Sequence, residues 1–425
     1  MQKFFSLLGF FLILVTTIIL SIFFIIDFNF FNLKKKLYSN FPNIELRTKI
    51  FNKKSVINNL ENDYNIKFLP YTQFENLNYK KKKINFENNL INNSKSIDKS
   101  ISYKKYNSFF IDLYEDKALI TDHLGNIYFF DQNKLLLDET NIFAKNIKNN
   151  LTVTRVFDSF IYNNKIYVSY TLKNKECNTI KVSSAKLNFN QLNFKNFFNP
   201  KECNKTGSPG RIQFYKNKNT DGLLISTSEG IHDEPGKNTQ NKNSIFGKIL
   251  FVPLDGEKET IYSTGHRVIQ GLNVFNQKII STEHGPRGGD EINFIENNGN
   301  YGWPDVSLGE RYDFNYENKK LSYKKDHKKN NFNEPIFSFI PSIGISEIIK
   351  LPNTFSVFYD DHYILSSLNG RSIFLIRFNK DLNKVLSLEK VFINNRIRDI
   401  KYLKKFSSII LALEEDGEIG VLTKN

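Results

Sequence analysis

Residues 118–130 read Ala-Leu-Ile-Thr-Asp-His-Leu-Gly-Asn-Ile-Tyr-Phe-Phe, so two short apolar runs stand on either side of a polar turn. Residues 409–422 repeat this arrangement, with an Asp-Gly turn between Ile409–Leu413 and Glu418–Leu422. Gly-Asn and Asp-Gly pairs between apolar runs are signals of a β-hairpin. The pattern therefore predicts antiparallel strands at both ends of a long stretch of the chain.

Similar apolar runs, bounded by Gly, Asp and Asn, recur from about residue 106 onward. Units of four short strands repeating about every fifty residues predict an all-β fold, a β-propeller of about six blades. A β-sandwich array is the structural alternative, but it does not require so many near-equal units. No long amphipathic helix interrupts the runs, which disfavours an α/β enzyme. The intervening runs are Ile166–Tyr170, Gly222–Ser226, Lys248–Val252, Leu272–Ser281, Tyr363–Ser366 and Ile373–Phe378.

Basic residues dominate the charge of the chain but form no recognisable nucleic-acid-binding module. The formal net charge is +15. The lysines are scattered or are expected in loops such as Lys80–Lys83 and Lys324–Lys329. A solvated basic surface explains this distribution, so we expect no nucleic-acid partner. Eight of the ten arginines lie between Arg211 and Arg398, which favours sites that need a planar, bidentate donor.

The segment from Phe4 to Ile26 is almost wholly apolar and contains no charged residue. An apolar run of about twenty residues spans a bilayer as a helix, so we predict a single-pass transmembrane anchor within residues 1–31. A cleaved signal peptide is the alternative, although its apolar core would be shorter. Lys34–Lys36 outweigh Lys3, which leaves the orientation open on the positive-inside rule. We expect an inner-membrane anchor with the body of the chain on the periplasmic, extracytoplasmic side.

The sequence after the predicted anchor has two parts, which differ in composition and in the periodicity of their apolar residues. Residues 32–105 are rich in Lys and Asn with little periodicity, and we interpret them as a linker and irregular lead-in that can contribute an outer strand. Residues 106–425 form the predicted propeller domain. Within it, Cys177 and Cys203 stand in matching Lys-Glu-Cys-Asn contexts. A disulfide between them would fit an oxidising compartment, and two unrelated free thiols are the alternative.

The residues most typical of a functional site form three runs within residues 263–304. Residues 263–272 read Ser-Thr-Gly-His-Arg-Val-Ile-Gln-Gly-Leu, and residues 282–293 read Thr-Glu-His-Gly-Pro-Arg-Gly-Gly-Asp-Glu-Ile-Asn. Residues 299–304 read Gly-Asn-Tyr-Gly-Trp-Pro. Glycines beside carboxylates permit tight, exposed backbone whose oxygens suit Ca²⁺, which takes six to eight oxygen ligands. An ordinary Gly-rich loop between strands is the alternative.

These three runs closely resemble a family of six-bladed propellers, the dehydrogenases of aldose sugars, glucose and sorbosone that use pyrroloquinoline quinone (PQQ). Weaker similarity in Gly210-Arg-Ile, Leu254-Asp-Gly256 and Arg396-Ile-Arg-Asp399 extends it over about residues 110–422. The resemblance implies oxidation of a sugar C1 hydroxyl by hydride transfer to the quinone. It also implies PQQ and Ca²⁺ as cofactors.

Carried over by position, the resemblance implies two calcium sites and a set of cofactor contacts. The carbonyls of Gly285 and Pro286 would face a calcium ion beneath the quinone, and Glu291 with the Tyr301 carbonyl would hold a structural calcium ion. PQQ carries three carboxylates, which Arg pairs with bidentately, and the calcium ion polarises the quinone as a Lewis acid. The implied cofactor-binding side chains are Arg267, Tyr312, Arg396 and Arg398.

The chain departs from the family pattern where the general base is expected. The family places a His four residues before the Gly-Arg arginine, and the residue here is Gly207. Neither Ser208 nor Thr206 has a pKa near neutral pH, so neither is a competent base. The family Asn after the motif Arg is Val268, and the Gln expected near residues 149–152 is absent. We therefore expect no catalytic residue at these positions.

Another histidine could substitute for the missing base. His232 lies in a loop after a predicted strand and is the one that could point into the pocket mouth. His266 and His284 belong to the family pattern and are expected to be local framework. The remaining three are expected at turns or on the surface; these are His123, His327 and His362.

Two functions follow from these observations. The first is a PQQ- and calcium-dependent sugar dehydrogenase tethered to the membrane near its electron acceptor. The second is a non-catalytic, calcium-stabilised propeller that binds a polar ligand or a protein partner, because a fold does not fix a function. The missing base favours the second, and the retained arginines indicate that an anionic ligand still binds.

Overall fold

The computed structural model describes residues 77–87, 108–173, 177–204, 208–230, 236, 238–311, 322–356, 359 and 361–424. The anchor predicted in residues 1–31 and most of the predicted lead-in lie outside these ranges. Within them, no helix is both long enough and apolar enough to cross a bilayer. The regular helices described there are short 3₁₀ turns, at Gln132–Leu135, Lys328–Asn330 and Lys404–Phe406.

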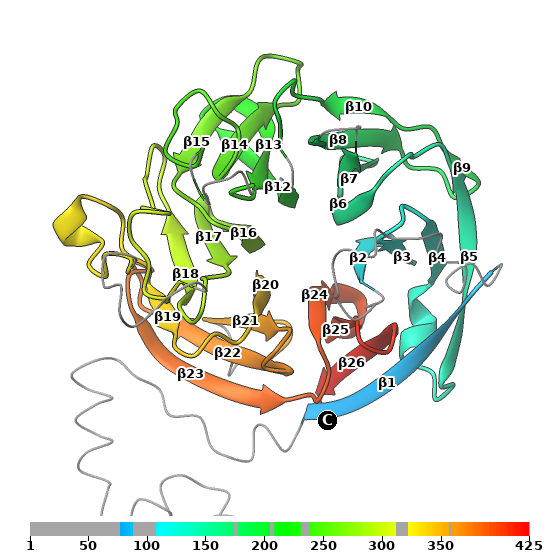
Figure 1. Cartoon of the computed structure of the whole chain (residues 1–425). Coiled ribbons are helices and arrows are strands. Elements are labelled where there is room, and N and C mark those ends of the chain that lie inside the picture. The colour runs from blue at the N-terminus through cyan, green and yellow to red at the C-terminus, as the bar shows by residue number, and fades with distance from the viewer. Residues whose placement is uncertain are drawn as a thin grey trace, which may run out of the picture. The chain divides into compact units, whose positions relative to one another are not determined.

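The described strands form one nine-stranded, one five-stranded and three four-stranded sheets. The nine-stranded sheet comprises two blades that are hydrogen-bonded to each other, so six antiparallel four-stranded blades surround an axis (Figure 1). The innermost strands of the ring are β2, β6, β12, β16, β20 and β24. This arrangement confirms the all-β propeller prediction. Blade 1 contains β2 (Phe109–Tyr114), β3 (Lys117–Asp122), β4 (Ile127–Asp131) and β5 (Asn141–Asn149); blade 2 contains β6 (Arg155–Tyr162), β7 (Lys165–Lys173), β8 (Asn178–Lys186) and β10 (Lys195–Phe198); blade 3 contains β12 (Pro209–Asn217), β13 (Thr220–Thr227), β14 (Lys248–Pro253) and β15 (Thr260–Thr264).

The other three blades complete the ring, and two very short strands flank it. Blade 4 contains β16 (Ile269–Phe275), β17 (Lys278–Glu283), β18 (Asp290–Ile295) and β19 (Phe337–Phe339); blade 5 contains β20 (Ile345–Lys350), β21 (His362–Ser367), β22 (Ser372–Phe378) and β23 (Val385–Phe392); blade 6 contains β24 (Ile397–Leu403), β25 (Ser408–Leu413), β26 (Glu418–Lys424) and β1 (Leu77–Phe86). The short strand β9 (Gln191–Leu192) pairs with β5, and β11 (Cys203–Asn204) pairs with β8.

Two-residue turns in the left-handed region set the register of two hairpins. Asn163 and Asn164 join β6 to β7, and both have positive φ, at 47° and 58°. Asn276 and Gln277 join β16 to β17, with φ of 49° and 62°. Two consecutive positive φ values define the turn whose twist matches that of paired strands, and Asn tolerates this conformation better than most residues.

The ring is closed by a strand from near the start of the described chain. Strand β1 pairs antiparallel with β26 and parallel with β5, so it joins blade 6 to blade 1. Lys80–Lys83 were expected in a loop, but they lie in this strand because the sheet edge offers them hydrogen-bonding partners on both sides. The buried Lys82 ammonium donates to the carbonyl oxygens of Leu137 and Glu139, the latter at 2.6 Å.

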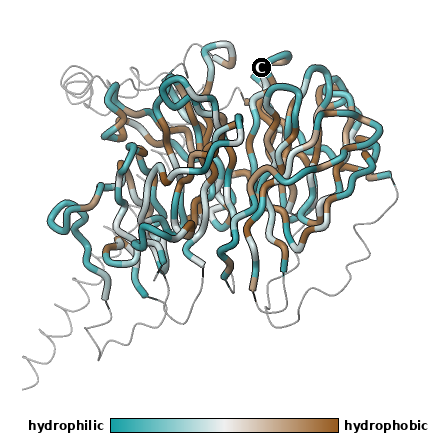
Figure 2. Tube along the Cα trace, turned by 90° about the horizontal axis from the view of Figure 1, so that it is seen from above, coloured by the Kyte–Doolittle hydropathy of each residue, from teal (hydrophilic) through white to brown (hydrophobic). Residues whose placement is uncertain are grey.

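The hydrophobic core is divided into clusters that lie between neighbouring blades. Leu119 of blade 1 packs in one cluster with Val168 of blade 2, and Leu224 of blade 3 packs in another with Leu272 of blade 4. Figure 2 shows hydrophobic residues concentrated within the strands and hydrophilic ones in the loops between them. Burial of apolar area contributes about 25 cal/mol per Å². The blades are therefore held mainly by contacts with their neighbours.

Cys177 and Cys203 form a disulfide, with Cα atoms 5.7 Å apart. The bond joins the start of β8 to β11, which pairs with it. The disulfide prediction is confirmed.

A buried cluster of charges lies on the axis, where the inner strands meet. Arg211 of β12 places Nη1 3.0 Å from Asp158 of β6. The same nitrogen lies 3.1 Å from Glu347 of β20 and 3.1 Å from Asp399 of β24. We call these four buried residues the axial cluster. Because its members come from blades 2, 3, 5 and 6, the cluster ties together blades that are not neighbours.

Replacement of Arg211 by Met is expected to lower the free energy of unfolding by about 3–5 kcal/mol, because three buried carboxylates would lose their shared countercharge. The measurement is urea-induced unfolding of the full chain in detergent. Lys216→Met is the matched control, since Lys216 is an exposed cation of the same strand, with 53% of its side chain accessible. That variant should change the value by less than about 0.5 kcal/mol. Equal losses in both variants would contradict a role for the axial cluster.

Candidate functional site

The predicted site residues that the structure describes lie at one face of the ring. In a blade of antiparallel strands, the start of the inner strand and the connection between the second and third strands lie at the same end. Arg267 precedes β16, and Arg398 lies at the start of β24. Gly285 and Pro286 lie in the connection between β17 and β18. The topology therefore brings together residues more than one hundred positions apart in sequence.

Irregular strand pairing marks the same end of the inner strands. Register shifts occur between Ile269 and Gly271 of β16 and between Ile397 and Asp399 of β24. Corresponding shifts occur near the starts of β6, β12 and β20. A bulge inserts a residue that is left out of the ladder and redirects its side chain. In β16 and β24 the inserted residues are Gln270 and Arg398, which both line a cavity at the axis.

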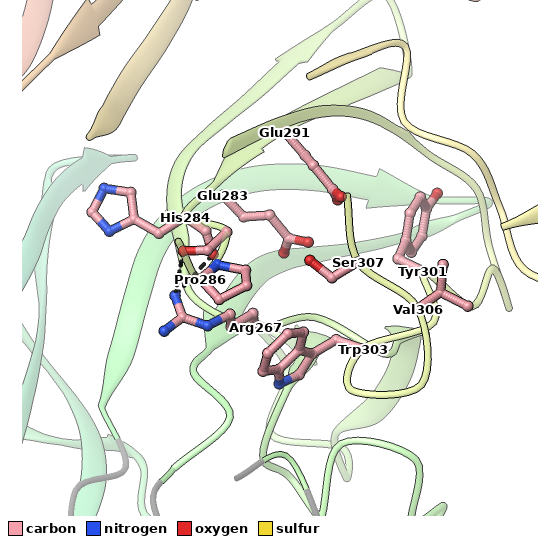
Figure 3. A pocket seen from close by; sticks show the side chains of 10 residues that line it. Arg267, Glu283, His284, Pro286, Glu291, Tyr301, Trp303, Val306 and Ser307 are labelled. Carbon is pink, nitrogen blue, oxygen red and sulfur yellow. Dashed lines mark hydrogen bonds between the residues drawn. The ribbon is translucent and has the colours of Figure 1, made fainter. Parts of the chain in front are cut away.

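Arg267 is fixed by partners on three sides. Its Nη1 donates to the carbonyl oxygens of His284 at 3.0 Å and Gly285 at 2.9 Å. Its Nε lies 3.4 Å from Glu229 Oε1, and its guanidinium carbon lies 5.3 Å from the centre of the Trp303 ring. Trp303 Nε1 in turn donates to Glu229 Oε2 at 2.7 Å. The guanidinium is thus held at the mouth of the cavity shown in Figure 3.

Arg396 and Arg398 share one carboxylate. Arg396 Nε donates to Glu414 Oε1 and Arg398 Nε to Glu414 Oε2, both at 2.8 Å. Ser108 Oγ also donates to Glu414, at 2.8 Å. Burial alone would raise the pKa of Glu414, but the charges of Arg398 and Arg396 outweigh it and lower that pKa to about 2. Two guanidinium groups around one carboxylate leave an excess positive charge at this face.

A second group of side chains forms a small acidic cavity beside Arg267. Glu283 of β17 and Glu291 of β18 are directly opposite one another in the ladder, and both are buried. Figure 3 shows their carboxyl groups and the Ser307 hydroxyl directed into the same space, whereas the His284 ring points away. Burial raises the pKa of Glu283 to about 7. Burial, and then repulsion from Glu283, raises the pKa of Glu291 as well.

The two predicted calcium positions differ in how well the described residues fit a cation. Two facing carboxyl groups with raised pKa values, beside Tyr301 in the same cavity, form a donor set that a hard cation would stabilise. The Gly285 carbonyl, in contrast, already accepts a hydrogen bond from Arg267. A metal at that oxygen would compete with a guanidinium. No group of three or more His, Cys, Asp or Glu side chains suited to a metal occurs in the part of the chain that the structure describes.

Of the two histidines of the motif, His266 is buried and His284 is half-buried. His266 stacks on Tyr301 with ring centres 4.7 Å apart, and its Nε2 lies 2.8 Å from Ser263 Oγ. Burial lowers the pKa of His266 to about 3 and that of His284 to about 4, so both are neutral and weakly basic. His327 lies at a turn, as expected, and is buried there. His362 was expected at a turn or on the surface, but it is buried because it is the first residue of strand β21.

Some predicted residues lie outside the described ranges, and some site residues were not predicted. Gly207, His232 and Tyr312 belong to segments that the structure does not describe. Sequence reasoning missed the carboxylates that hold the arginines, Glu229 and Glu414. Glu414 directly follows β25 and Glu229 stands two residues after β13, each the second strand of its blade. A Glu shortly after an apolar run was the available signal.

Comparisons with known proteins point to one family. The family model described as "Glucose / Sorbosone dehydrogenase" matches residues 108–421. An uncharacterised protein of Synechocystis is 26% identical over 219 residues, which cover 46% of this chain and 52% of that protein. The aldose sugar dehydrogenase of Escherichia coli is 27% identical over 173 residues, which cover 40% of this chain and 45% of that enzyme. The chain spans about half the length of these curated relatives.

Solved structures share the fold. A glucose dehydrogenase crystal structure has a TM-score of 0.61 at 18% identity, covering 75% of this chain and 96% of that one. The PQQ-bound form of an aldose sugar dehydrogenase from Streptomyces coelicolor has a TM-score of 0.55 at 17% identity, covering 76% of this chain and 95% of that one. At such low identity, the likeness shows the propeller fold alone.

Replacement of Glu414 by Gln is expected to destabilise the chain near neutral pH, by about 1–3 kcal/mol. The folded-state pKa of Glu414 lies below its ordinary value, so its stabilisation is present above about pH 4.5 and is lost as the pH falls toward 2. Urea unfolding at pH 6, 4 and 3 measures the difference between the wild type and Glu414→Gln. That difference should shrink as the pH falls. A difference that stays constant would show that Glu414 does not hold the arginines through its charge.

Proposed function

Because the chain belongs to the glucose/sorbosone dehydrogenase family, we propose that it binds PQQ at the face of the propeller that carries Arg267, Arg396 and Arg398. The proposed activity is that of a quinone-dependent dehydrogenase acting on the C1 hydroxyl of a sugar. The named aldose sugar dehydrogenase among its relatives supports this reaction class.

The observation that carries the proposal is the excess of positive charge at this face. Three arginines gather there with two buried acidic partners, Glu229 and Glu414. PQQ carries three carboxylates, and the planar guanidinium matches a carboxylate with two parallel hydrogen bonds. These arginines would hold and orient a polycarboxylate ring above the axis.

The reaction requires a proton acceptor as well as a hydride acceptor. Bound PQQ would supply the two-electron acceptor for the hydride from C1. The proton of the C1 hydroxyl must pass to a base, giving a lactone as product. Position 207 carries no side chain in this sequence. His266 and His284 are too weakly basic to replace one, so proton removal is the step for which this chain is least equipped.

The acidic cavity is the proposed site of a structural calcium ion. Glu291 and the Tyr301 carbonyl would hold a structural calcium ion, and Glu283 faces the same space. A cation there would relieve the repulsion between two buried carboxylates and fix the connection that carries Gly285 and Pro286. A second calcium ion under the quinone, contacted by the carbonyls of these two residues, would have to displace the hydrogen bond that Arg267 donates to Gly285.

The missing base favours a second candidate function, a non-catalytic propeller that binds an anionic ligand or a protein partner. In both cases we propose that the N-terminal segment anchors the chain in the inner membrane with the propeller in the periplasm. A membrane electron acceptor would then lie within reach of the dehydrogenase. The disulfide between Cys177 and Cys203 supports an oxidising compartment.

The test uses the full chain in detergent, supplied with Ca²⁺ and PQQ. A bound quinone spectrum together with dye reduction by aldoses is expected of a dehydrogenase. A spectrum without turnover would support binding of PQQ without catalysis. No spectrum would overturn the dehydrogenase proposal and would favour the non-catalytic propeller with another partner. Gly207→His, which restores a base at the family position, should raise turnover by about 10²-fold or more if only the base has been lost. Unchanged turnover in that variant would show that other parts of the site have decayed.

Calcium binding has a separate readout in thermal stability. Saturating Ca²⁺ at about 100 times its dissociation constant should stabilise the wild type by about 2.7 kcal/mol, seen as a rise in Tm. Glu291→Gln should abolish this rise, because it removes one of the two buried carboxylates. Glu257→Gln should retain the rise, because Glu257 is exposed and does not line the acidic cavity. A rise that persists in Glu291→Gln would place the ion elsewhere.

A further inference from the structure

Lys248, the first residue of β14, is a fully buried cation that the proposed function does not use. Its ammonium group donates to three backbone carbonyl oxygens, those of Asn238 at 3.1 Å, Thr239 at 2.6 Å and Phe246 at 2.8 Å. An ammonium group has three N–H donors, so these bonds engage all of them. Backbone carbonyl oxygens are also ligands of bound cations. Lys248 therefore gathers the segment 238–247, which leads into β14, as a bound ion would.

The segment 238–247 is also held by a carboxylate, that of Glu202. Its Oε1 accepts a hydrogen bond from the Ser244 hydroxyl at 2.6 Å, and its Oε2 accepts one from the backbone amide of Ile245 at 2.8 Å. Two charged groups therefore act on one segment. Lys248 joins its two ends, and Glu202 fixes residues between them.

Thr239 and Gln240, at one end of this segment, hold the backbone of Trp303. The Thr239 hydroxyl and the Gln240 side-chain amide both donate to the carbonyl oxygen of Trp303, at 2.6 and 2.7 Å. Gln240 also exchanges two hydrogen bonds with the side chain of Asn300, at 2.8 and 3.1 Å. Thr239 is thus bonded through its carbonyl to Lys248 and through its hydroxyl to Trp303.

Trp303 lies beside Arg267 at the proposed cofactor face (Figure 3). The guanidinium carbon is 5.3 Å from the centre of the indole ring. Glu229 contacts both side chains, because it accepts from Trp303 Nε1 at 2.7 Å and lies 3.4 Å from Arg267 Nε. A shift of the indole would therefore release one side of the guanidinium, which backbone carbonyls hold on the other. A chain of direct contacts thus links Lys248 to Arg267.

We propose that Lys248 is a positioning residue of the cofactor site, an internal cation whose ammonium fixes the segment that seats the Trp303 indole against Arg267. The inference rests on the proposed function, since Arg267 matters here as a partner of a PQQ carboxylate. Lys248 itself does not line the cavity that Arg267 borders. Its loss acts through the orientation of Arg267, and loss of one charge-assisted hydrogen bond should weaken PQQ binding by roughly tenfold to a hundredfold.

The experiment compares Lys248→Met with Lys216→Met in the full chain, in detergent at pH 7. Burial lowers the pKa of Lys248 to about 8, so the wild-type ammonium carries its charge at that pH. Lys216 is an exposed lysine of the same blade and serves as the matched control. Thr239→Val keeps Lys248 but removes the hydroxyl bonded to Trp303, and it provides a second variant in case Lys248→Met does not fold.

Trp303 is the only tryptophan of the chain, so its fluorescence reports on this link in the absence of any ligand. Its emission spectrum is recorded without ligand, and PQQ binding is then titrated by absorbance. Urea unfolding of each variant verifies that the fold is retained.

In Lys248→Met and Thr239→Val, we expect the Trp303 emission to shift to longer wavelength, because the buried indole would gain contact with water. PQQ binding should weaken in both, and Lys216→Met should match the wild type. An unshifted emission in a folded Lys248→Met, or in Thr239→Val where Lys248→Met does not fold, would overturn the inference. A shifted emission with wild-type affinity for PQQ would overturn it as well, since Arg267 would then not depend on Trp303.

In either of these cases, PQQ binding by the wild type leaves the proposed function standing. A wild type that binds no PQQ would overturn the proposed function, whereas a shifted emission would still support the link from Lys248 to Trp303.

Discussion

The contacts of Arg211 on the propeller axis are the constraint on which the rest of the structure depends. A single guanidinium from blade 3 meets Asp158 of blade 2, Glu347 of blade 5 and Asp399 of blade 6. Its Nε and Nη2 donate to the carbonyls of Gln270 and Arg398, in blades 4 and 6. The apolar clusters join each blade to its neighbours, whereas this network joins blades across the ring, as does the hydrogen bond from Arg398 to the Gln270 side chain. The planar guanidinium of Arg211 has five N–H donors in a fixed geometry, which lets one side chain contact all these carboxylates and carbonyls. A Lys ammonium, with three donors on one nitrogen, could not.

The carboxylates of the axial cluster also fix the backbone of adjacent blades. Asp399 accepts from the amide of Ile111, and Asp158 accepts from the amide of Ile212, at 2.9 and 2.8 Å. Burial raises the pKa of Glu347 to about 7, although the charge of Arg211 opposes this rise. Asp399 and Asp158 therefore have a second function, which is to accept hydrogen bonds from amides of the inner strands.

The axial cluster positions the candidate site through the backbone. The carbonyls of Gln270 and Arg398, which Arg211 holds, belong to the bulged residues whose side chains line the axial cavity. Glu414 then aligns Arg396 and Arg398 from the next strand of the same blade. Arg267 is held separately, by Glu229 and Trp303. The arginines of the site are thus held partly by the inner strands of the ring and partly by residues in the loops. Side chains fixed in this way by a rigid scaffold are preorganised for binding.

Local sequence patterns predicted the strands, the blades and most of the site-bearing loops, because hairpin turns and alternating apolar residues are local signals. The sequence by itself also determined the disulfide pairing partners and the arginine and glycine positions of the long motif. Only the tertiary structure decided that Lys80–Lys83 form a closing strand, since pairing with β26 and β5 involves residues far apart in the chain. The same holds for the burial of Glu283 opposite Glu291 and for the partners of Arg211 and Arg398. Which charges meet depends on ring closure, a non-local property that short-range sequence patterns do not encode.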